Sequence, residues 1–201
     1  MRHPQIYVET VIRADIERVW ELTQNPALHP LWDLRFSSIT PTEPLDSGAR
    51  RFVYERRIPF HTIGGTGTSI GERSRPDGTR TSALRFTTAD PLSPLGEGRG
   101  YWRYVPTDDG VRFITGYTFA PGWGSLIDRL FMRRLVGWMT AWSFDRLRIW
   151  AETGVAPTRT PAMDVLAFWR RDRPRAGRCL RAPGTATRYD APATLETLEA
   201  P

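Results

Sequence analysis

Between residues 6 and 119 the chain alternates apolar and polar residues in short runs, the pattern of a β-sheet with one buried face. Residues 6–13, IYVETVIR, show the two-residue period of a half-buried strand. Further runs of strand length are rich in β-branched or aromatic residues and are separated by turn-forming residues: 35–40, 49–55, 61–72, 79–88, 98–106 and 111–119. Strands in series pair antiparallel, and the Asp109-Gly110 pair predicts a tight hairpin between the last two.

Apolar residues change to helical spacing at three points along the chain. Residues 16–23 follow a good N-cap residue, Asp15, and residues 25–32 form a second short helix that Pro30 interrupts. A much longer helix is predicted over residues 125–152, which at 1.5 Å per residue would be about 40 Å long. The long helix is therefore long enough to cross a whole domain.

Start and stop signals bound the long helix. Ser125 and Asp128 match a capping box, in which the serine oxygen accepts backbone N–H groups at the start of a helix. Gly154 favours the left-handed conformation that ends a helix. With successive residues 100° apart, one arc of about 120° collects the large apolar side chains Ile127, Phe131, Leu135, Trp138, Met139, Trp142 and Ile149. Asp145 interrupts this face, and because burying a lone carboxylate costs several kcal/mol, we expect it to be paired, hydrated in a cavity or placed past the edge of the sheet.

The order of these elements predicts an α+β domain with a helix-grip architecture. A curved antiparallel sheet of about seven strands must bury one face, and the long C-terminal helix is the largest element available to cover it. Residues two apart in a strand share a face. The inward set is therefore Phe52, Tyr54, Leu84, Phe86, Trp102, Tyr104, Phe113, Thr115, Tyr117 and Phe119. Arg85, Arg103 and Arg112 are expected to point to solvent.

The sequence changes character after Gly154. We expect residues 1–153 to form one ligand-binding domain and residues 154–201 to be an extension rich in proline and arginine, partly disordered and without structure from residue 185 onward. Residues 163–171 could form a short helix. Residues 163–182 hold more arginine than aspartate, so this stretch is either a solvated tail with one docked segment or a peripheral contact with an anionic membrane or a protein through Phe168 and Trp169.

Composition narrows the function further. The chain has 28 basic residues, none of which is lysine, so Schiff-base and P-loop lysine chemistry are excluded. We attribute the missing lysine to a GC-rich, bacterial genome. The net charge of +6 is spread among acidic residues, so we expect no nucleic-acid partner. A single cysteine, Cys179, and an N-terminus without an apolar signal region predict a cytoplasmic protein, and no transmembrane span is expected.

No motif for a metal or cofactor stands out. The three histidines have no metal-binding spacing, so we expect neither a metal nor a cofactor. The glycine-rich residues 64–67 are interpreted as a tight turn or bulge, because they precede a strand and lack the lysine of a phosphate loop. Catalysis in an apolar cavity would need a polar group there. The available groups are Tyr54, His61, Tyr104, Tyr117 and Asp145, but no catalytic residue is assigned.

Two short motifs carry a family resemblance. The pattern D-x-x-x-V-W at residues 15–20, the pattern P-x-x-x-x-x-W at residues 26–32 with Asp33 after it, and the long terminal helix together resemble the SRPBCC superfamily. This superfamily contains START-like, polyketide cyclase/dehydrase and lipid-transport proteins. The resemblance covers residues 5–153 and implies a helix-grip fold that holds a hydrophobic ligand between the sheet and the long helix.

Three functions follow from this resemblance and stay open. The first is binding of a small hydrophobic ligand (lipid, polyketide or aromatic compound) as a carrier or sensor. The second is a cyclase or dehydratase-like enzyme, and the third is a protein-interaction module without a ligand. We expect a cavity of about 300 Å³ or more, lined by Trp102, Tyr104, Trp138 and Trp142. The full set of candidate ligand-binding residues is Tyr54, Phe86, Trp102, Tyr104, Phe113, Tyr117, Phe131, Leu135, Trp138, Met139 and Trp142.

Overall fold

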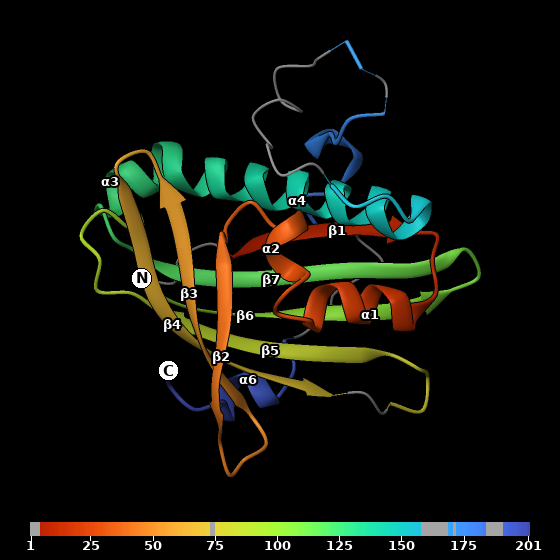
Figure 1. The fold of residues 1–201 in the computed structure, drawn as a ribbon, viewed down its shortest axis with the longest axis horizontal. Helices are drawn as coiled ribbons and strands as arrows, with labels where there is room; N and C mark the ends of the chain where they lie inside the picture. Colours follow the sequence, from red (N-terminus) through yellow and green to blue (C-terminus); the bar gives the residue numbers. More distant parts are fainter. Residues whose placement is uncertain (1–4, 73–74, 158–168, 171, 184–190) are drawn as a thin grey trace.

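One strand, two short helices, six strands and a long helix follow one another along the chain (Figure 1). The computed structural model describes residues 5–72, 75–157, 169–170, 172–183 and 191–201. The strands are β1 (Ile6–Ile12), β2 (Ser38–Pro44), β3 (Arg50–Ile58), β4 (His61–Glu72), β5 (Arg80–Thr87), β6 (Leu95–Thr107) and β7 (Gly110–Pro121). The helices after β1 are α1 (Ile16–Gln24) and α2 (His29–Trp32).

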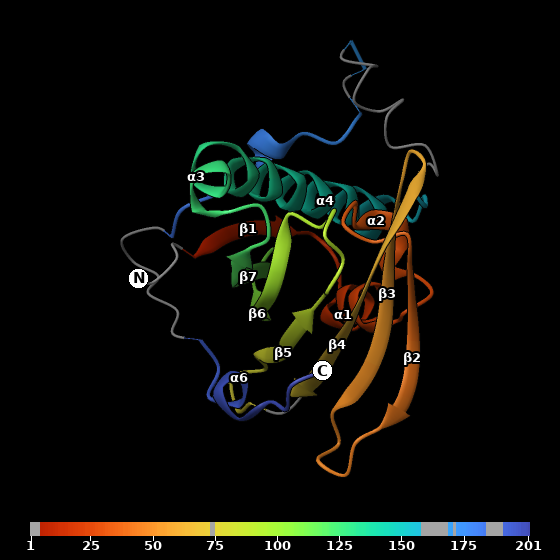
Figure 2. The ribbon, with the colours of Figure 1, turned by 90° about the vertical axis from the view of Figure 1, so that its left-hand side faces the viewer.

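All strands belong to one antiparallel sheet with the order β1-β7-β6-β5-β4-β3-β2. The sheet curves from β1 round to β2, with α4, α2 and α1 on its inner side (Figure 2). The predicted hairpin joins β6 to β7 through a turn at Asp108 and Asp109, and Gly110 begins β7 with a φ of 130° that would strain any other residue. The predicted helix-grip fold is therefore confirmed.

The cap of α1 is also as predicted, since the Asp15 carboxylate accepts the Glu17 backbone N–H at 2.7 Å. The long helix has three parts: α3 (Ser125–Ile127), a π-helical turn (Asp128–Met132) and α4 (Arg133–Thr153). Its end is confirmed, because Gly154 has a φ of 74° and donates its N–H to Trp150.

The predicted capping box at the start of the long helix is wrong. Gly124 precedes the helix, and no side chain caps it. The Asp128 carboxylate is buried and instead accepts a hydrogen bond from Arg133 Nε at 2.9 Å. This ion pair and the π-helical turn replace the expected start. Successive residues therefore do not keep the regular spacing of 100° through residues 128–132.

The face of α4 that meets the sheet also differs from the prediction. Buried on that side are Val136, Thr140, Ser143, Phe144 and Leu147. Two of these are polar residues that the apolar pattern could not indicate: the Thr140 hydroxyl bonds the Tyr117 hydroxyl at 2.7 Å, and the Ser143 hydroxyl accepts the Leu34 N–H at 3.0 Å. Hydroxyls with partners can be buried at little cost, so they take places that the pattern assigns to large apolar residues.

The C-terminal segment packs against α4 and β1. Leu180 exchanges two backbone hydrogen bonds of 2.9 Å with Glu9 of β1. The buried Asp145 carboxylate accepts hydrogen bonds from the Arg175 N–H at 2.7 Å and from Arg148 Nε at 2.7 Å. Of the three placements expected for Asp145, the structure shows the paired one, and its partners hold this segment in place. Of the helix expected over residues 163–171, the structure describes residues 169–170 alone, and Phe168 lies outside the described residues.

Residues 191–201 are ordered on the outer face of the sheet, contrary to our expectation of disorder. The helix α6 (Thr194–Thr197) places Leu195 and Leu198 against Ala83 and Tyr101 (Figure 2). The neighbouring Arg103 is buried over the Tyr101 ring, so the prediction that it points to solvent is wrong. Among the helices of the described residues, none is long and apolar enough to cross a membrane.

Candidate functional site

A cavity of about 330 Å³ lies between the inner face of the sheet and the start of α4. The predicted volume is confirmed. Its wall comes from strands β3 to β7, from the α2–β2 connection, from the β5–β6 loop and from residues 132–139. Most wall side chains are aromatic or aliphatic, so the cavity offers an apolar ligand a surface with few competing polar groups.

The structure brings part of the predicted ligand-binding set together. The members that line the cavity are Tyr54, Phe86, Trp102, Tyr117, Leu135 and Met139. Sequence reasoning missed other wall residues as ligand contacts, namely Phe36, Phe52, Leu84, Trp123 and Val136. Phe52 and Leu84 could have been found, because they alternate with Tyr54 and Phe86 on the predicted inner face. Phe36 and Trp123 lie in connections, where no periodic pattern indicates direction.

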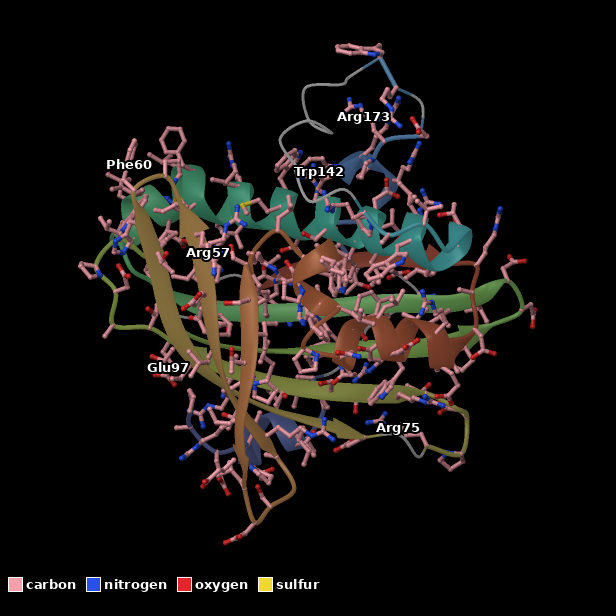
Figure 3. The ribbon with its side chains drawn as sticks, viewed as in Figure 1. Arg57, Phe60, Arg75, Glu97, Trp142 and Arg173 are labelled. Carbon is pink, nitrogen blue, oxygen red and sulfur yellow. The ribbon has the colours of Figure 1, made fainter. Side chains whose placement is uncertain are left out.

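The remaining candidates lie elsewhere. Tyr104 and Phe113 are fully buried core residues, and the Tyr104 hydroxyl bonds Thr23 and Gln24 of α1 at 2.7 and 2.9 Å. Phe131 is 68% exposed. Trp138 and Trp142 pack ring against ring with centroids 5.3 Å apart, and Figure 3 shows Trp142 on the side of α4 away from the sheet. The lining that we predicted from Tyr104, Trp138 and Trp142 is therefore wrong, because, of the predicted α4 face, only Leu135 and Met139 reach the cavity.

Glycines opposite aromatic residues keep the cavity open. Three aromatic side chains of the wall or its floor have a glycine as their direct partner on the next strand: Tyr54 with Gly65, Phe52 with Gly67 and Phe86 with Gly98. At each of these glycines a Cβ would collide with the partner's ring, so the ring lies flat over the bare backbone. Rings that lie along the sheet leave space above them, whereas upright rings would fill it. Residues 64–67 are thus part of β4 and of this floor, and they pair with β3 without a register shift, so the interpretation as a tight turn or bulge is wrong.

A buried ion pair supplies the main polar group of the wall. Arg35 lines the cavity and donates from Nε and Nη2 to the Asp33 carboxylate at 2.9 and 2.6 Å. Burial acts to raise the pKa of Asp33, but the Arg35 charge and a hydrogen bond from His29 outweigh it, so that this pKa lies far below its usual value. Asp33 is therefore ionised, and the pair can remain buried because it is neutral overall.

The tyrosines of the wall stay protonated. Burial raises the pKa of Tyr54 to about 12. Burial also raises the pKa of Tyr117, although the Arg35 guanidinium, 5.4 Å from the centre of its ring, opposes this. Phenols with raised pKa values donate hydrogen bonds at neutral pH. Both hydroxyls have protein partners, since Tyr54 donates to the Thr87 carbonyl at 3.3 Å and Tyr117 bonds Thr140 at 2.7 Å. The charged groups that the wall presents to an oxygen atom of a ligand are therefore the guanidinium groups of Arg35 and Arg56.

A second hollow of about 370 Å³ lies beside the cavity, between α1 and strands β2 to β5. The two share a partition made of Phe36, Phe52, Leu84 and Trp102. The second hollow has more polar walls, which include Gln24, Arg50, Ser69 and Ser82. An apolar ligand therefore fits the first cavity better than the second.

The other polar candidates do not reach the cavity. His61 is at the rim, where its Nε2 lies 2.8 Å from the Asp90 carboxylate. Asp145 is occupied with the C-terminal segment, and Tyr104 with α1. Within the described ranges no three histidine, cysteine, aspartate or glutamate side chains are grouped to hold a metal ion. The absence of a metal or cofactor stays a prediction.

Comparison with known proteins gives one curated relative and many solved structures with this fold. The uncharacterized membrane protein YndG of Bacillus subtilis is 43% identical over 164 residues, which are 79% of this chain. The chain spans 61% of that relative's length. A STAR-related lipid transfer protein from Xanthomonas axonopodis has a TM-score of 0.52 and 17% identity, covering 72% of this chain and 83% of its own.

The Zhui aromatase/cyclase from a Streptomyces species has a TM-score of 0.53 and 11% identity, and the match covers 75% of this chain and 97% of that one. At such identities the two solved structures show the shared fold alone. The profile of the family described as polyketide cyclase / dehydrase and lipid transport matches residues 3–152, which include the whole sheet and almost all of α4. The chain therefore belongs to this family, within the SRPBCC superfamily.

Proposed function

We propose that the protein binds a small hydrophobic ligand, such as a lipid, a polyketide or an aromatic compound, as a carrier or sensor. The observation that supports this most directly is the apolar cavity of about 330 Å³ with its glycine-backed aromatic floor. Its volume lies at the lower end of the range of about 300 to 1,000 Å³ for small-molecule sites. A floor built from aromatic and glycine pairs maintains space that ordinary core packing would remove.

The polar groups indicate how such a ligand would be oriented. Two arginines line the cavity: Arg35, which is paired with Asp33 and lies next to Tyr117, and Arg56. A guanidinium can donate to a carbonyl, carboxylate or sulfonate oxygen. The favoured ligand is therefore apolar over most of its length and carries an oxygen-bearing group at one end.

Ligand binding can be measured with anilinonaphthalene sulfonate, a fluorescent aromatic anion. We expect one dye molecule per protein, and a dissociation constant at least about tenfold higher in Met139→Trp, because the larger side chain fills the cavity. Val155→Trp is the matched control, since Val155 is exposed and lies outside the cavity. Melting curves of both variants test whether they are folded. Equal dye binding by the wild type and a folded Met139→Trp variant would contradict the proposal.

The Arg35 and Tyr117 pair also favours a second candidate, a cyclase or dehydratase-like enzyme. A guanidinium in an apolar cavity can polarise a ligand carbonyl, and a nearby phenol can donate a proton. Incubation with β-polyketone substrates followed by mass spectrometry would detect loss of water. The double variant Asp33→Asn, Arg35→Gln removes the ion pair without changing the net charge, and it should abolish such turnover while leaving binding of uncharged aromatic compounds intact.

Several expectations remain predictions. A cytoplasmic location and a bacterial origin rest on the sequence. The contact of residues 163–182 with an anionic membrane or a protein rests on their charge and on Trp169, which is exposed.

Native mass spectrometry of the protein purified from its own host would detect a bound compound and would also give the oligomeric state.

A further inference from the structure

Large apolar side chains are exposed together at one end of the molecule. They come from the β3–β4 hairpin, from the β5–β6 loop and from the start of the long helix, which lie side by side in Figures 1 and 2. We call them the apolar tip: Ile58, Phe60, Leu92, Trp123, Leu126 and Phe131. Single exposed apolar residues are normal on a protein surface, but a contiguous group indicates an interaction site.

Phe60 is the most informative residue of the apolar tip. Its side chain is fully exposed at the end of the hairpin and is labelled at the left of Figure 3. Its φ of 65° is in the left-handed region, which glycine or asparagine would occupy with less strain. A bulky aromatic residue at this position contributes nothing to the core and strains the backbone, so it is better explained by a contact outside the molecule.

Basic residues accompany the apolar tip. Arg129 and Arg134 are exposed on the start of the long helix, and Arg57 is exposed on the hairpin, where it lies 3.9 Å from Glu55. The acidic residues nearby are already engaged: Asp90 with His61, Asp128 with Arg133, and Glu55 with Ser38 and Arg57. This end of the molecule therefore combines exposed aromatic and aliphatic groups with surplus positive charge, which complements the surface of an anionic bilayer.

The cavity opens at the same end. Ile58, Leu92 and Trp123 belong both to the apolar tip and to the cavity wall, and each is partly exposed. Residues that line a cavity and also reach solvent mark its mouth. An apolar molecule that enters or leaves by this mouth passes over the apolar tip.

We propose that the apolar tip docks on a membrane surface that contains anionic lipids. Phe60, Leu126 and Phe131 enter the boundary between headgroups and acyl chains, and the arginines lie among the lipid phosphates. In this position the cavity mouth faces the bilayer. Docking itself is independent of the cavity, but its use for ligand exchange rests on the function proposed above.

The shape of the apolar tip favours a bilayer over a protein partner. It is formed by the ends of a hairpin, a loop and a helix, and not by a groove or a flat face (Figure 2). Flat, complementary surfaces are typical of subunit interfaces. Separate projecting side chains can each enter a fluid bilayer without a matching partner surface.

Sedimentation with lipid vesicles tests the proposal. We expect the wild type to bind vesicles of phosphatidylcholine with phosphatidylglycerol, and to bind phosphatidylcholine alone more weakly, with binding falling as salt rises. The double variant Phe60→Ser, Leu126→Ser should bind at least about tenfold more weakly. Neither residue lines the cavity, so its affinity for the cavity dye should stay unchanged. Trp169→Ser is the matched control, because Trp169 is also an exposed aromatic residue and lies at another place.

A fluorescent label can show which end meets the lipid. The chain has one cysteine, Cys179, which is buried, and burial raises the pKa of its thiol to about 12, so it should not react with a thiol dye. An environment-sensitive dye on Phe60→Cys should shift to shorter wavelength when anionic vesicles are added. The same dye on Asp109→Cys, in the β6–β7 hairpin at the opposite end of the sheet, should not shift (Figure 1).

Three results would overturn the proposal. One is absence of binding to anionic vesicles at low salt. The second is binding that Trp169→Ser weakens and the double variant does not, which would assign the membrane contact to the C-terminal segment. The third is a dimer in solution that the double variant dissociates, which would make the apolar tip a subunit interface. Loss of vesicle binding with intact dye binding leaves the proposed ligand function unaffected.

Discussion

At the scale of single residues, the cavity depends on which residue faces which across neighbouring strands. The aromatic positions of β3 and β5 are visible in the sequence as an alternating pattern. Their glycine partners are not, because the pairing of Phe86 with Gly98 depends on the register between β5 and β6. The sequence could therefore predict aromatic side chains on the inner face, but it could not predict that Gly65, Gly67 and Gly98 would let them lie flat.

This arrangement makes a prediction for Gly98→Ala. The new Cβ would collide with the Phe86 ring, which must then move into the cavity, so we expect weaker dye binding and a loss of about 1 to 3 kcal/mol in unfolding free energy. Gly64→Ala is the matched control, because a Cβ at residue 64 would meet no atom within 4 Å. Thermal melts and dye titrations of both variants provide the measurement. Equal behaviour of the two variants would show that the aromatic floor does not depend on the glycines.

At the scale of elements, the long helix shows what periodicity can and cannot give. Its length and its end at Gly154 were predictable, because helix-forming residues and a left-handed glycine are local signals. Its start and its buried face were not. A π-helical turn shifts residues 128–132, and Thr140 and Ser143 are buried through hydrogen bonds to other elements. Both depend on tertiary contacts, which a hydrophobicity pattern does not record.

The two tryptophans of α4 distinguish core packing from cavity lining. Trp142 is 2% exposed and belongs to the main core, whereas its neighbour Trp138 is 37% exposed. We expect Trp142→Ala to lower the unfolding free energy by about 3 kcal/mol or more, and Trp138→Ala to cost clearly less. Dye affinity should change little in either variant, since neither side chain lines the cavity. Urea unfolding measures the first effect, and a cost of Trp142→Ala no greater than that of Trp138→Ala would contradict it.

At the scale of the whole molecule, the C-terminal region connects two distant faces. Residues 172–183 pack against α4 and β1, and residues 191–201 cover part of the outer face of the sheet. The sequence predicted the domain core well, because serial strands and a long helix have strong local patterns. It could not predict these docked segments, because a few apolar residues such as Leu195 and Leu198 form no periodic pattern. Their role becomes visible only with the surface that they cover.

Removal of residues 155–201 tests the predicted domain boundary. The sheet and the long helix are complete before that cut, and we therefore expect the shortened protein to fold cooperatively. It should melt at a lower temperature than the full chain. Asp145 loses the Arg175 N–H and Arg178 as partners, and burial of Leu195 and Leu198, about 1.5 to 3 kcal/mol for each side chain, is also lost.

A shorter deletion separates these two contributions. Removing residues 191–201 leaves Asp145 with all its partners, so the fall in melting temperature should be a fraction of that caused by the longer cut. The variant Leu195→Ser, Leu198→Ser should reproduce the effect of the shorter deletion, because these side chains make the apolar contact with Ala83 and Tyr101. Glu196→Gln is the control, since Glu196 is exposed on the same helix. If the longer cut leaves the melting temperature unchanged, the docked segments do not contribute to stability, and if it prevents folding, the domain extends beyond residue 154.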